Sequence, residues 1–440
     1  MATTVPEPSA AADVLLPALA PADPQRSDLA RRLLLTVLLL VVARALHAIP
    51  LPGFDPVIVT PTYLDLWEPG LGGFGMLRSS PWSLFSIGAL GVTPYISAWI
   101  IVHLVVACVP SVQAPSKPGR MRLNDHVRCT ALAIALLQGY AVATEIDHLQ
   151  TLRGISATAD TGLLFRLPAA LSLAAGSLFL VWLGEQITEF GIGFGVPLII
   201  ASGFVTKVPE GLASVFDLWS HAAIPGAAIV VLLAAVSAVI LATIVIQRVR
   251  YIVPVRSPSG REGCDIVGGE ARRWELGFNP AGIIPLLCTS AFVSGIGLHA
   301  SPPARNWTLW LDDWAAHGGP TYLALHFLFI IFAAVVFALL LGDSTATADE
   351  LKRSCVFIPG IPPGEATADH LRRVSTRLAA LGGTALAAMA LGPEIVSSAI
   401  RLPGFLDGTG LMTVAMVTLA AVPAIRESWR RWNRSAGSTI

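Results

Sequence analysis

Apolar runs of about twenty residues recur along the whole chain, and this recurrence limits the possible fold more than any other feature. A helix of about that length crosses the roughly 30 Å hydrocarbon core of a bilayer. Because hydrocarbon offers no partner to backbone N–H and C=O groups, each run is expected to form a helix. The candidate spans lie near residues 31–49, 82–109, 126–144, 165–187, 194–216, 226–246, 281–299, 321–341, 375–396 and 409–425. The sequence therefore predicts an all-α polytopic membrane protein with ten transmembrane helices.

The composition agrees with this class. Of the 440 residues, 54% are hydrophobic and 13% are charged, whereas soluble domains average about 25% charged residues. Neither a nucleotide-binding loop nor a paired catalytic constellation is recognisable, and Glu185 and Glu189 lie at a predicted cytosolic helix end, which favours a solvated or structural role. We therefore expect no enzyme activity and no cofactor. The cysteines show no CxxC spacing and indicate neither a disulfide framework nor a metal site: Cys108, Cys129, Cys264, Cys288 and Cys355.

The distribution of lysine and arginine predicts the side of the membrane that each loop occupies. One set of tails and loops holds 22 of the 29 basic residues and the other set holds six, so the positive-inside rule places both termini in the cytosol. Arg44, the remaining base, lies near the far end of the first span, where its side chain can snorkel to the interface. Residues 1–30 lack the order of a signal peptide and are predicted to be a disordered cytosolic tail. Residues 426–440 are predicted to be a cytosolic C-terminal tail.

The stretch 71–110 cannot be one ordinary membrane helix, because it contains its own breaks. A glycine-rich piece leads through Pro81 into an apolar run that carries Gly88 and Pro94 and becomes fully lipid-compatible from Ile96. Backbone breaks at membrane depth persist only where protein or a water-filled cavity surrounds them. The stretch therefore indicates a pore or a substrate site, and a kinked helix that only packs is the alternative.

Broken segments recur in the fifth and tenth spans, at residues 191–200 and 408–412. Short or interrupted segments at matching places in two halves are typical of an internal repeat with a site at its interface. Five spans in each half would give this repeat inverted topology. We therefore expect an N-terminal half at 31–218 and a C-terminal half at 219–425.

Two long loops on the predicted cytosolic side are basic and punctuated by proline and glycine, at about 247–278 and 342–374. Connections of that length are uncommon unless they bind something. Charge alone leaves two interpretations open, a docking surface and a solvated loop that only sets topology.

The segment WLGEQITEFGIGFG (182–195) resembles the SecY family, the channel subunit of the bacterial protein translocase, where the chain leaves the fourth helix and enters the fifth. Four more segments resemble this family in the right order. They are RRLLLTVLLLVVARALHAIPLPGFD (31–55) for the first helix, GALGVTPYISAWIIVHL (88–104) for the second, FNPAGIIP (278–285) for the seventh, and FIPGIPPGEATADHLRRVSTRL (357–378) for the last long cytosolic loop and the start of the ninth. The resemblance covers nearly the whole chain.

This resemblance implies a clamshell of two five-helix halves around an hourglass pore. It places an apolar pore ring at Val92, Ile96, Ile200 and Leu287, with Met412 or Thr413 nearest on the last helix. A narrow ring of aliphatic side chains holds an extended polypeptide without specific bonds and resists wetting when it is empty. Without the resemblance, plain core packing would be the simpler interpretation of these residues.

The resemblance also implies a plug and a lateral gate. The plug is expected within about 62–78, around Leu71, Gly72, Gly73, Phe74 and Gly75. The gate opens to lipid between helices two and seven, and the polar residues that match its lining are Gln138, Thr289 and Ser290. Polar pairs between membrane helices average only about 0.6 kcal/mol, which suits a gate that must open. For a serine or threonine, a hydrogen bond to its own helix backbone is an equally good interpretation.

The implied function is a protein-conducting channel of the general secretory pathway in the bacterial plasma membrane. Such a channel passes unfolded polypeptides across the membrane and releases apolar segments sideways into the lipid bilayer. The implied partners are small SecE-like and SecG-like membrane subunits, a SecA-like motor ATPase and/or a ribosome, and unfolded clients. The residues expected to dock the cytosolic partner are Arg248, Arg250, Lys352, Arg353, Pro362, Arg372 and Arg373.

One departure from the family pattern concerns this docking surface. The last loop reads PGIPPGE, with Pro362 where the family arginine usually lies, and proline cannot replace a multidentate guanidinium. A specialised or inactive paralogue is therefore an alternative. A secondary transporter with broken helices is another, but it predicts a buried charged or polar cluster, whereas the one base assigned to neither set of tails and loops is the peripheral Arg44.

Overall fold

The computed structural model describes residues 29–54, 85–108, 117–153, 162–221, 225–255, 272–289, 320–342, 344–353, 356–400, 411–419 and 422. Eight long helices in these ranges coincide with predicted spans: α2 (Leu29–Ala45), α4 (Thr93–Cys108), α5 (Lys117–Arg153), α6 (Leu163–Phe190), α7 (Gly195–Ser220), α8 (Gly226–Arg248), α11 (Pro320–Leu341) and α13 (Glu365–Ile400). The seventh and tenth predicted spans fall only partly within the described ranges, which are helical at 284–289 and 411–419.

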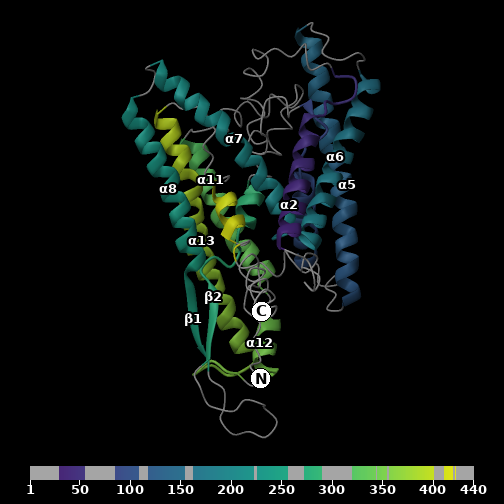
Figure 1. The fold of residues 1–440 in the computed structure, drawn as a ribbon. Helices are drawn as coiled ribbons and strands as arrows, with labels where there is room; N and C mark the ends of the chain where they lie inside the picture. Colours follow the sequence, from purple (N-terminus) through teal and green to yellow (C-terminus); the bar gives the residue numbers. More distant parts are fainter. Residues whose placement is uncertain are drawn as a thin grey trace, which may run out of the picture.

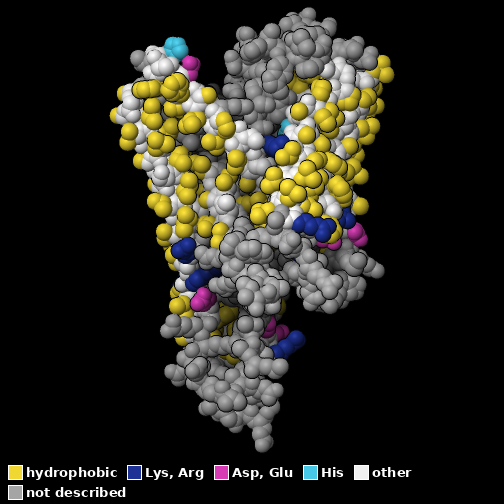
Figure 2. Space-filling view, viewed as in Figure 1, with side chains coloured by type: hydrophobic (Ala, Val, Ile, Leu, Met, Phe, Trp, Pro, Cys, Tyr) yellow, Lys and Arg dark blue, Asp and Glu magenta, His cyan; other side chains and the backbone are white. Residues whose placement is uncertain are grey.

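The surface of the described helices is that of a multi-pass membrane protein. Within the described ranges, α5, α6, α8, α11 and α13 are long and apolar enough to cross a bilayer, and α4 and α7 contribute shorter apolar stretches. Hydrophobic side chains cover the visible flanks of the helices, whereas Lys, Arg, Asp and Glu gather mainly at their lower ends and below them (Figure 2). An apolar belt between charged ends is the expected pattern for a chain that crosses a membrane several times.

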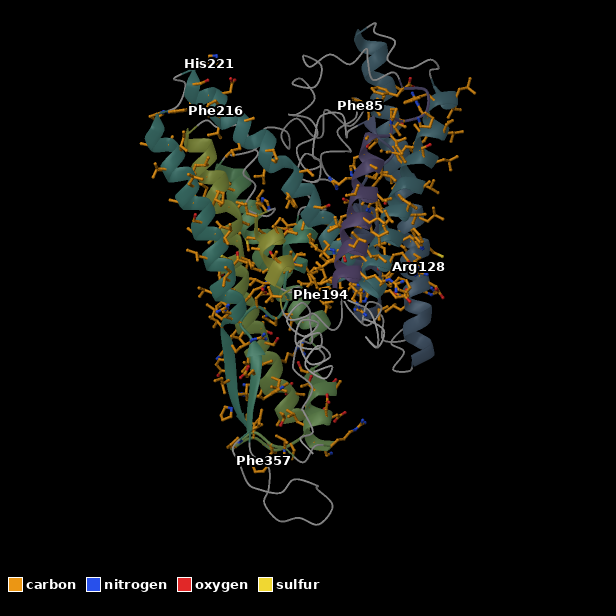
Figure 3. All side chains as sticks on the ribbon, viewed as in Figure 1. Phe85, Arg128, Phe194, Phe216, His221 and Phe357 are labelled. Atoms are coloured by element: carbon orange, nitrogen blue, oxygen red, sulfur yellow. The ribbon has the colours of Figure 1, made fainter. Side chains whose placement is uncertain are left out.

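The helices form two groups, with α7 between them (Figure 1). In one group α5 packs along α4 and α6, and α2 packs against α6; in the other, α13 packs along α11 and α8. Phe194 and His221 flank α7 and mark its course from the middle of the molecule to one upper corner (Figure 3). The predicted boundary between the halves, at residue 218, falls inside α7 and stays a prediction.

Glycines let the helices approach closely, which matters because helix association in a bilayer depends on van der Waals contact instead of a hydrophobic driving force. A Cβ on Gly139 of α5 would lie 2.9 Å from the Ala170 carbonyl oxygen of α6. A Cβ on Gly383 of α13 would lie 2.7 Å from the Ala334 Cβ of α11. Larger residues at these positions would push the paired helices apart.

The described parts of the two long loops fold against each other below the group of α8, α11 and α13 (Figure 1). β1 (Arg250–Val255) and β2 (Arg272–Gly277) form an antiparallel hairpin, and α12 (Ser344–Arg353) packs against α13. We call the hairpin, α12 and residues 356–371 the loop module. Its buried core consists of Val253, Val255, Val356, Ile358 and Leu371.

The loop module differs from the sequence prediction in two respects. The fold is not entirely helical, because the 247–278 loop contributes the hairpin. The 342–374 loop is largely helical, because α12 lies within it and α13 begins at Glu365, ahead of the predicted span. Long apolar runs reveal neither feature, since each strand of the hairpin has only six residues and the first turns of α13 are polar.

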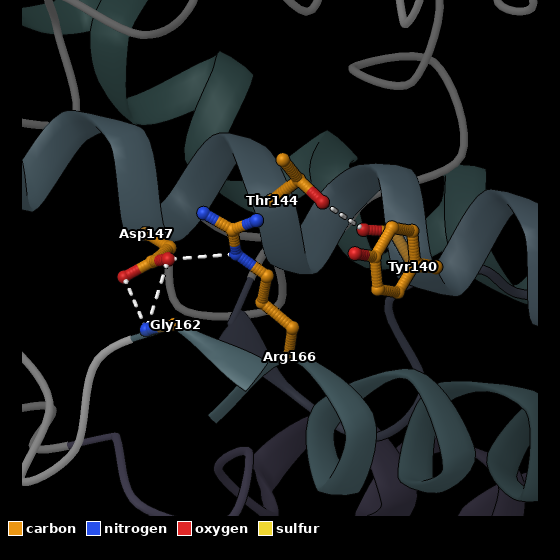
Figure 4. A network of polar contacts seen from close by, with 5 residues as sticks. All are labelled: Tyr140, Thr144, Asp147, Gly162 and Arg166. Carbon is orange, nitrogen blue, oxygen red and sulfur yellow. Dashed lines mark hydrogen bonds and ion pairs between the residues drawn. The ribbon is translucent and has the colours of Figure 1, made fainter. Parts of the chain in front are cut away.

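A buried ion pair closes one end of the α5–α6 hairpin (Figure 4). Nε of Arg166 donates to Oδ2 of Asp147 at 2.7 Å, and the N–H of Gly162 lies 3.3 and 3.1 Å from the two carboxylate oxygens. The Asp147 side chain is 4% exposed and the Arg166 side chain 23%. The carboxylate thus ties the first turn of α6 to α5.

A more exposed ion pair joins the same two helices at their other end. Nη2 of Arg128 donates to both carboxylate oxygens of Glu185, at 2.8 and 2.9 Å. The two side chains are 56% and 26% exposed. Glu185 therefore has a structural partner, in line with the structural role considered for it.

The two ion pairs predict unequal effects on stability. Asp147→Asn leaves Arg166 partly buried without its counter-charge, so we expect a loss of about 3 kcal/mol, the lower end for a broken buried pair. Glu185→Gln, at the exposed pair, is expected to cost about 0–1 kcal/mol. Thermal unfolding of both variants in one detergent, followed by tryptophan fluorescence, measures the difference. Equal shifts in Tm would contradict the proposed importance of the buried pair.

Candidate functional site

The predicted break ahead of α4 is a tight turn whose amides bond to nearby backbone. Gly91 has φ +58°, in the left-handed region that favours glycine, and its N–H donates to the Gly88 carbonyl at 2.9 Å. The Phe85 carbonyl accepts a hydrogen bond from the N–H of Leu51 at 2.8 Å, which ties the turn to the segment that follows α2. Pro94 occupies the first turn of α4, where a missing N–H is tolerated.

Four predicted pore-ring residues lie in one apolar cluster. Val92 and Ile200 are buried in it, and Ile96 and Leu287 pack against it with partial exposure. They come from the turn before α4, from α4, from α7 and from the helical residues 284–289. We call these four residues the constriction cluster.

The last helix offers two candidates for the pore ring, Met412 and Thr413, and both are buried. Met412 is fully buried and packs with Leu286 and Leu386 in a separate cluster of the α8–α11–α13 group. Thr413 is also buried. Its place in the ring stays a prediction.

The connection from α6 to α7, residues 191–194, brings α7 to the constriction cluster through very close backbone contact. A Cβ on Gly195, the first residue of α7, would lie 1.9 Å from the carbonyl oxygen of Gly184 in α6. Gly193 has φ +79°, which again favours glycine. This contact gives a physical reason for glycines in the WLGEQITEFGIGFG segment. We call residues 191–194 the α6–α7 joint.

A second apolar cluster lies where the two helix groups meet, and we call it the gate seam. Trp99 of α4 and Phe337 of α11 are its large aromatic members. The seam places α4 against residues 281–288, the pair of segments that the family resemblance makes the lateral gate. Its buried residues are Ala98, Trp99, Val102, Val127, Ala131, Ala281, Ile284, Ala333 and Phe337.

The polar gate candidates show different environments. Oε1 of Gln138 is buried and has no hydrogen-bond partner among the described residues. Oγ1 of Thr289 is buried and donates to the Pro285 carbonyl at 2.7 Å, which is the local helix bond considered as its alternative role. Ser290 lies outside the described residues, as do the plug candidates 71–75.

The docking candidates are exposed on the loop module or at its junctions with the helices. Pro362 lies in the loop before α13, and its carbonyl accepts a hydrogen bond from Oγ1 of Thr367 at 2.9 Å. Phe357 marks the lower edge of the module (Figure 3). The exposed basic candidates are Arg248, Arg250, Lys352, Arg353, Arg372 and Arg373.

Apolar packing dominates this candidate site. Within the described ranges there is no group of three His, Cys, Asp or Glu side chains that could hold a metal ion. Sequence reasoning did not identify Trp99 and Phe337, although the spacing of Ala98, Trp99 and Val102 on one helical face was a usable signal. It also did not identify the hydroxyl groups of Thr36 and Thr188, which accept hydrogen bonds from backbone amides of Ile192 in the α6–α7 joint and of Gly195 directly after it.

Comparison with known proteins assigns the family. The SecY family model matches residues 86–422, which include both helix groups apart from α2. The chain belongs to the SecY family. It is 30% identical over 399 residues to protein translocase subunit SecY of Escherichia coli (strain K12), covering 89% of this chain and 90% of the relative. It is also 30% identical over 408 residues to the subunit of the same name from Rickettsia conorii, covering 91% and 93%.

Solved structures share the SecY fold. A SecY structure concerned with the plug domain and the closed state of the channel has a TM-score of 0.63 at 16% identity, with 94% of this chain and 96% of that chain covered. The structure of a protein conducting channel gives 0.59 at 15% identity, and Sec61 in a canine ribosome-channel complex gives 0.56 at 15%; both cover the same 94% and 96%. The predicted SecY-type architecture is therefore confirmed, whereas two of the ten predicted helices lie partly outside the described ranges.

Proposed function

We infer that this protein is the protein-conducting channel subunit of a Sec translocase. The observation that carries this conclusion is the match to SecY relatives along about nine-tenths of the chain. These relatives are named as protein translocase subunits. The protein is a channel and not an enzyme. A secondary transporter is not favoured, because the relatives and the fold both belong to protein channels.

In this proposal the constriction cluster forms the pore ring. Val92, Ile96, Ile200 and Leu287 are flexible aliphatic side chains that come together from separate segments. Such a ring adapts to any extended polypeptide, since it makes no directional bonds, and it resists wetting when the pore is empty. Thr413 would add a hydroxyl to this ring, and the plug assigned to about 62–78 would cover it in the resting channel.

The gate seam is proposed as the route by which apolar segments leave the channel for lipid. Packing between α4 and residues 281–288 closes this route at rest. A signal sequence that offers competing apolar contacts shifts the equilibrium toward the open seam, because it binds that state better. Gln138, Thr289 and Ser290 are proposed to line the gate.

The proposed location is the bacterial plasma membrane, with both termini in the cytosol and the loop module on the cytosolic side. Here SecE-like and SecG-like subunits surround the channel, and a SecA-like motor or a ribosome drives or delivers unfolded clients. A solved Sec61 channel in complex with a ribosome supports the choice of such a partner. A specialised or inactive paralogue, the alternative that Pro362 suggests in the sequence, is not favoured by the relatives or by the fold.

The pore ring predicts a change in resting conductance. Ile96→Ser places a hydroxyl in the constriction cluster and weakens its resistance to wetting, so resting ion leak across planar bilayers should rise. Ile101→Ser is the matched control, because Ile101 lies on the same helix and is exposed outside the cluster. Equal leak from both variants, at equal channel number, would exclude Ile96 from the ring.

The gate seam predicts a crosslink that stops transport. Cysteines at Val102 and Ile284, in a background without the native cysteines, should be joined by a short bifunctional thiol reagent, because both positions belong to the seam. The pair Ile101 and Ile284 is the control, since Ile101 is exposed on another face of α4. Crosslinking should block passage of a signal-bearing client in reconstituted vesicles. Continued passage through the crosslinked channel would argue against obligatory gating at this seam.

Pro362 lies in a loop whose shape is already fixed. Ile358 and Ile361 pack into the module core, and Thr367 binds the Pro362 carbonyl. Gly360 and Gly364 have φ values of +82° and +110°, which favour glycine. An arginine at position 362 would therefore be presented to solvent from an ordered loop.

This loop predicts that Pro362→Arg strengthens docking of a SecA-like motor. The gain should be on the order of 1.5–3 kcal/mol, the range for hydrogen bonds to charged groups. Pro363→Arg adds the same charge one residue away and controls for general attraction, which salt screens over roughly 8 Å. Titration of the purified motor at two salt concentrations compares them. Equal affinities for the two variants and the native chain would show that the motor docks through other residues.

A further inference from the structure

We propose that the hydroxyl groups of Thr36 and Thr188 clamp the α6–α7 joint and thereby position α7 at the constriction cluster. The two threonines lie on different helices, α2 and α6, and both are buried. Each hydroxyl contacts the joint or the first residue of α7. The part of this inference that concerns the pore rests on the function proposed above.

Thr188 supplies the first amide of α7 with a partner. Its Oγ1 accepts a hydrogen bond from the N–H of Gly195 at 2.9 Å and donates to the Gly184 carbonyl at 2.9 Å. The first amides of a helix have no partner inside the helix and need one from elsewhere. Phe194, which precedes α7, gives no side-chain cap. Thr188 therefore caps α7 from the preceding helix.

Thr36 fixes the middle of the joint from α2. Its Oγ1 accepts a hydrogen bond from the N–H of Ile192 at 3.0 Å and donates to the Arg32 carbonyl at 2.8 Å. A Cβ on Gly191 would lie 2.5 Å from this hydroxyl oxygen, so glycine is required for α2 to approach. The bond joins residues 156 positions apart in the chain. It therefore links α2 directly to the entrance of α7.

Both hydroxyls use their donor and an acceptor position at once. Donation to a carbonyl in the same helix orients each hydroxyl, so that a lone pair faces the joint. Ile192 and Gly195 are buried, which leaves their amides dependent on these oxygens. Valine has nearly the shape of threonine but neither donates nor accepts, whereas serine keeps the hydroxyl. The two substitutions therefore separate the hydrogen bonds from the packing.

The clamp matters for the pore because α7 enters the constriction cluster soon after the joint. Val196, Ile199 and Ile200 belong to the first turns of α7 and pack in the larger apolar cluster that includes the constriction cluster. Leu183 and Ile187 of α6 pack in the same cluster. Loss of the clamp would let the first turn of α7 shift relative to α6, and Ile200 would shift with it.

The test uses the full chain in lipid nanodiscs for hydrogen exchange and in planar bilayers for resting ion leak. The variants are Thr36→Val, Thr188→Val and their serine counterparts. Thr243→Val is the matched control, because Thr243 is also buried and donates to the Val239 carbonyl but accepts no amide among the described residues. Thermal unfolding of every variant confirms that it is folded.

The valine variants should exchange the amides of Ile192 and Gly195 on the order of tenfold faster or more, because a buried N–H without a partner favours opening. They should also raise resting leak, whereas the serine variants and Thr243→Val should resemble the native chain. Unchanged exchange at residues 191–195 in the valine variants would overturn the clamp.

Two further outcomes separate this inference from the proposed pore ring. Faster exchange with native leak, while Ile96→Ser leaks, would overturn the positioning of α7 by the clamp. Faster exchange with native leak in both the threonine variants and Ile96→Ser would support the clamp and overturn the ring assignment instead.

Discussion

A backbone amide or carbonyl inside a bilayer must find its partner within the protein, and the breaks in this chain follow from that requirement. The turn before α4 bonds to itself and to the segment after α2. At the α6–α7 joint, threonine hydroxyls accept hydrogen bonds from the backbone N–H groups of Ile192 and Gly195. At residues 279–283, Nδ2 of Asn279 donates to the Gly282 carbonyl at 2.8 Å. Each break contains a member of the constriction cluster, as at Val92, or lies a few residues before one, as with Ile200 and Leu287.

The membrane helices and the loop module are each stabilised by a different interaction. Among the membrane helices, close packing at glycines such as Gly139 and Gly383 replaces the hydrophobic effect, which lipid does not supply. The loop module lies beyond the apolar helices and builds a small core of its own around Val253 and Leu371, where removal of apolar surface from water is the driving force. A substitution of a buried apolar residue therefore weakens close packing in the membrane helices, whereas in the loop module it also reduces the apolar surface removed from water.

The sequence predicted the helical spans well, because about twenty apolar residues have few alternatives in a bilayer. The convergence of Val92, Ile96, Ile200 and Leu287 was expected only through the family resemblance, since nothing local to each residue specifies the other segments. The roles of Thr36 and Thr188 could not be predicted, because a threonine that bonds to its own helix has the same sequence signature as one that also accepts a distant amide. Thr289 and Thr243 belong to the first kind within the described ranges. The hairpin was missed because each of its strands has only six residues, and α12 was missed because it is short and polar.

One continuous helix connects the loop module to the membrane. α13 contains 36 residues, about 54 Å of helix. Near its start Leu371 is part of the module core, and farther along Leu386 and Ala390 are buried among α8, α11 and the last helix. α13 is therefore packed into the loop module near its start and into the membrane helices farther along, so it can act as a lever between them. A partner that tilts the module would exert a torque on the helix group in which Leu286, the neighbour of Leu287, is packed, without needing to reach the pore itself.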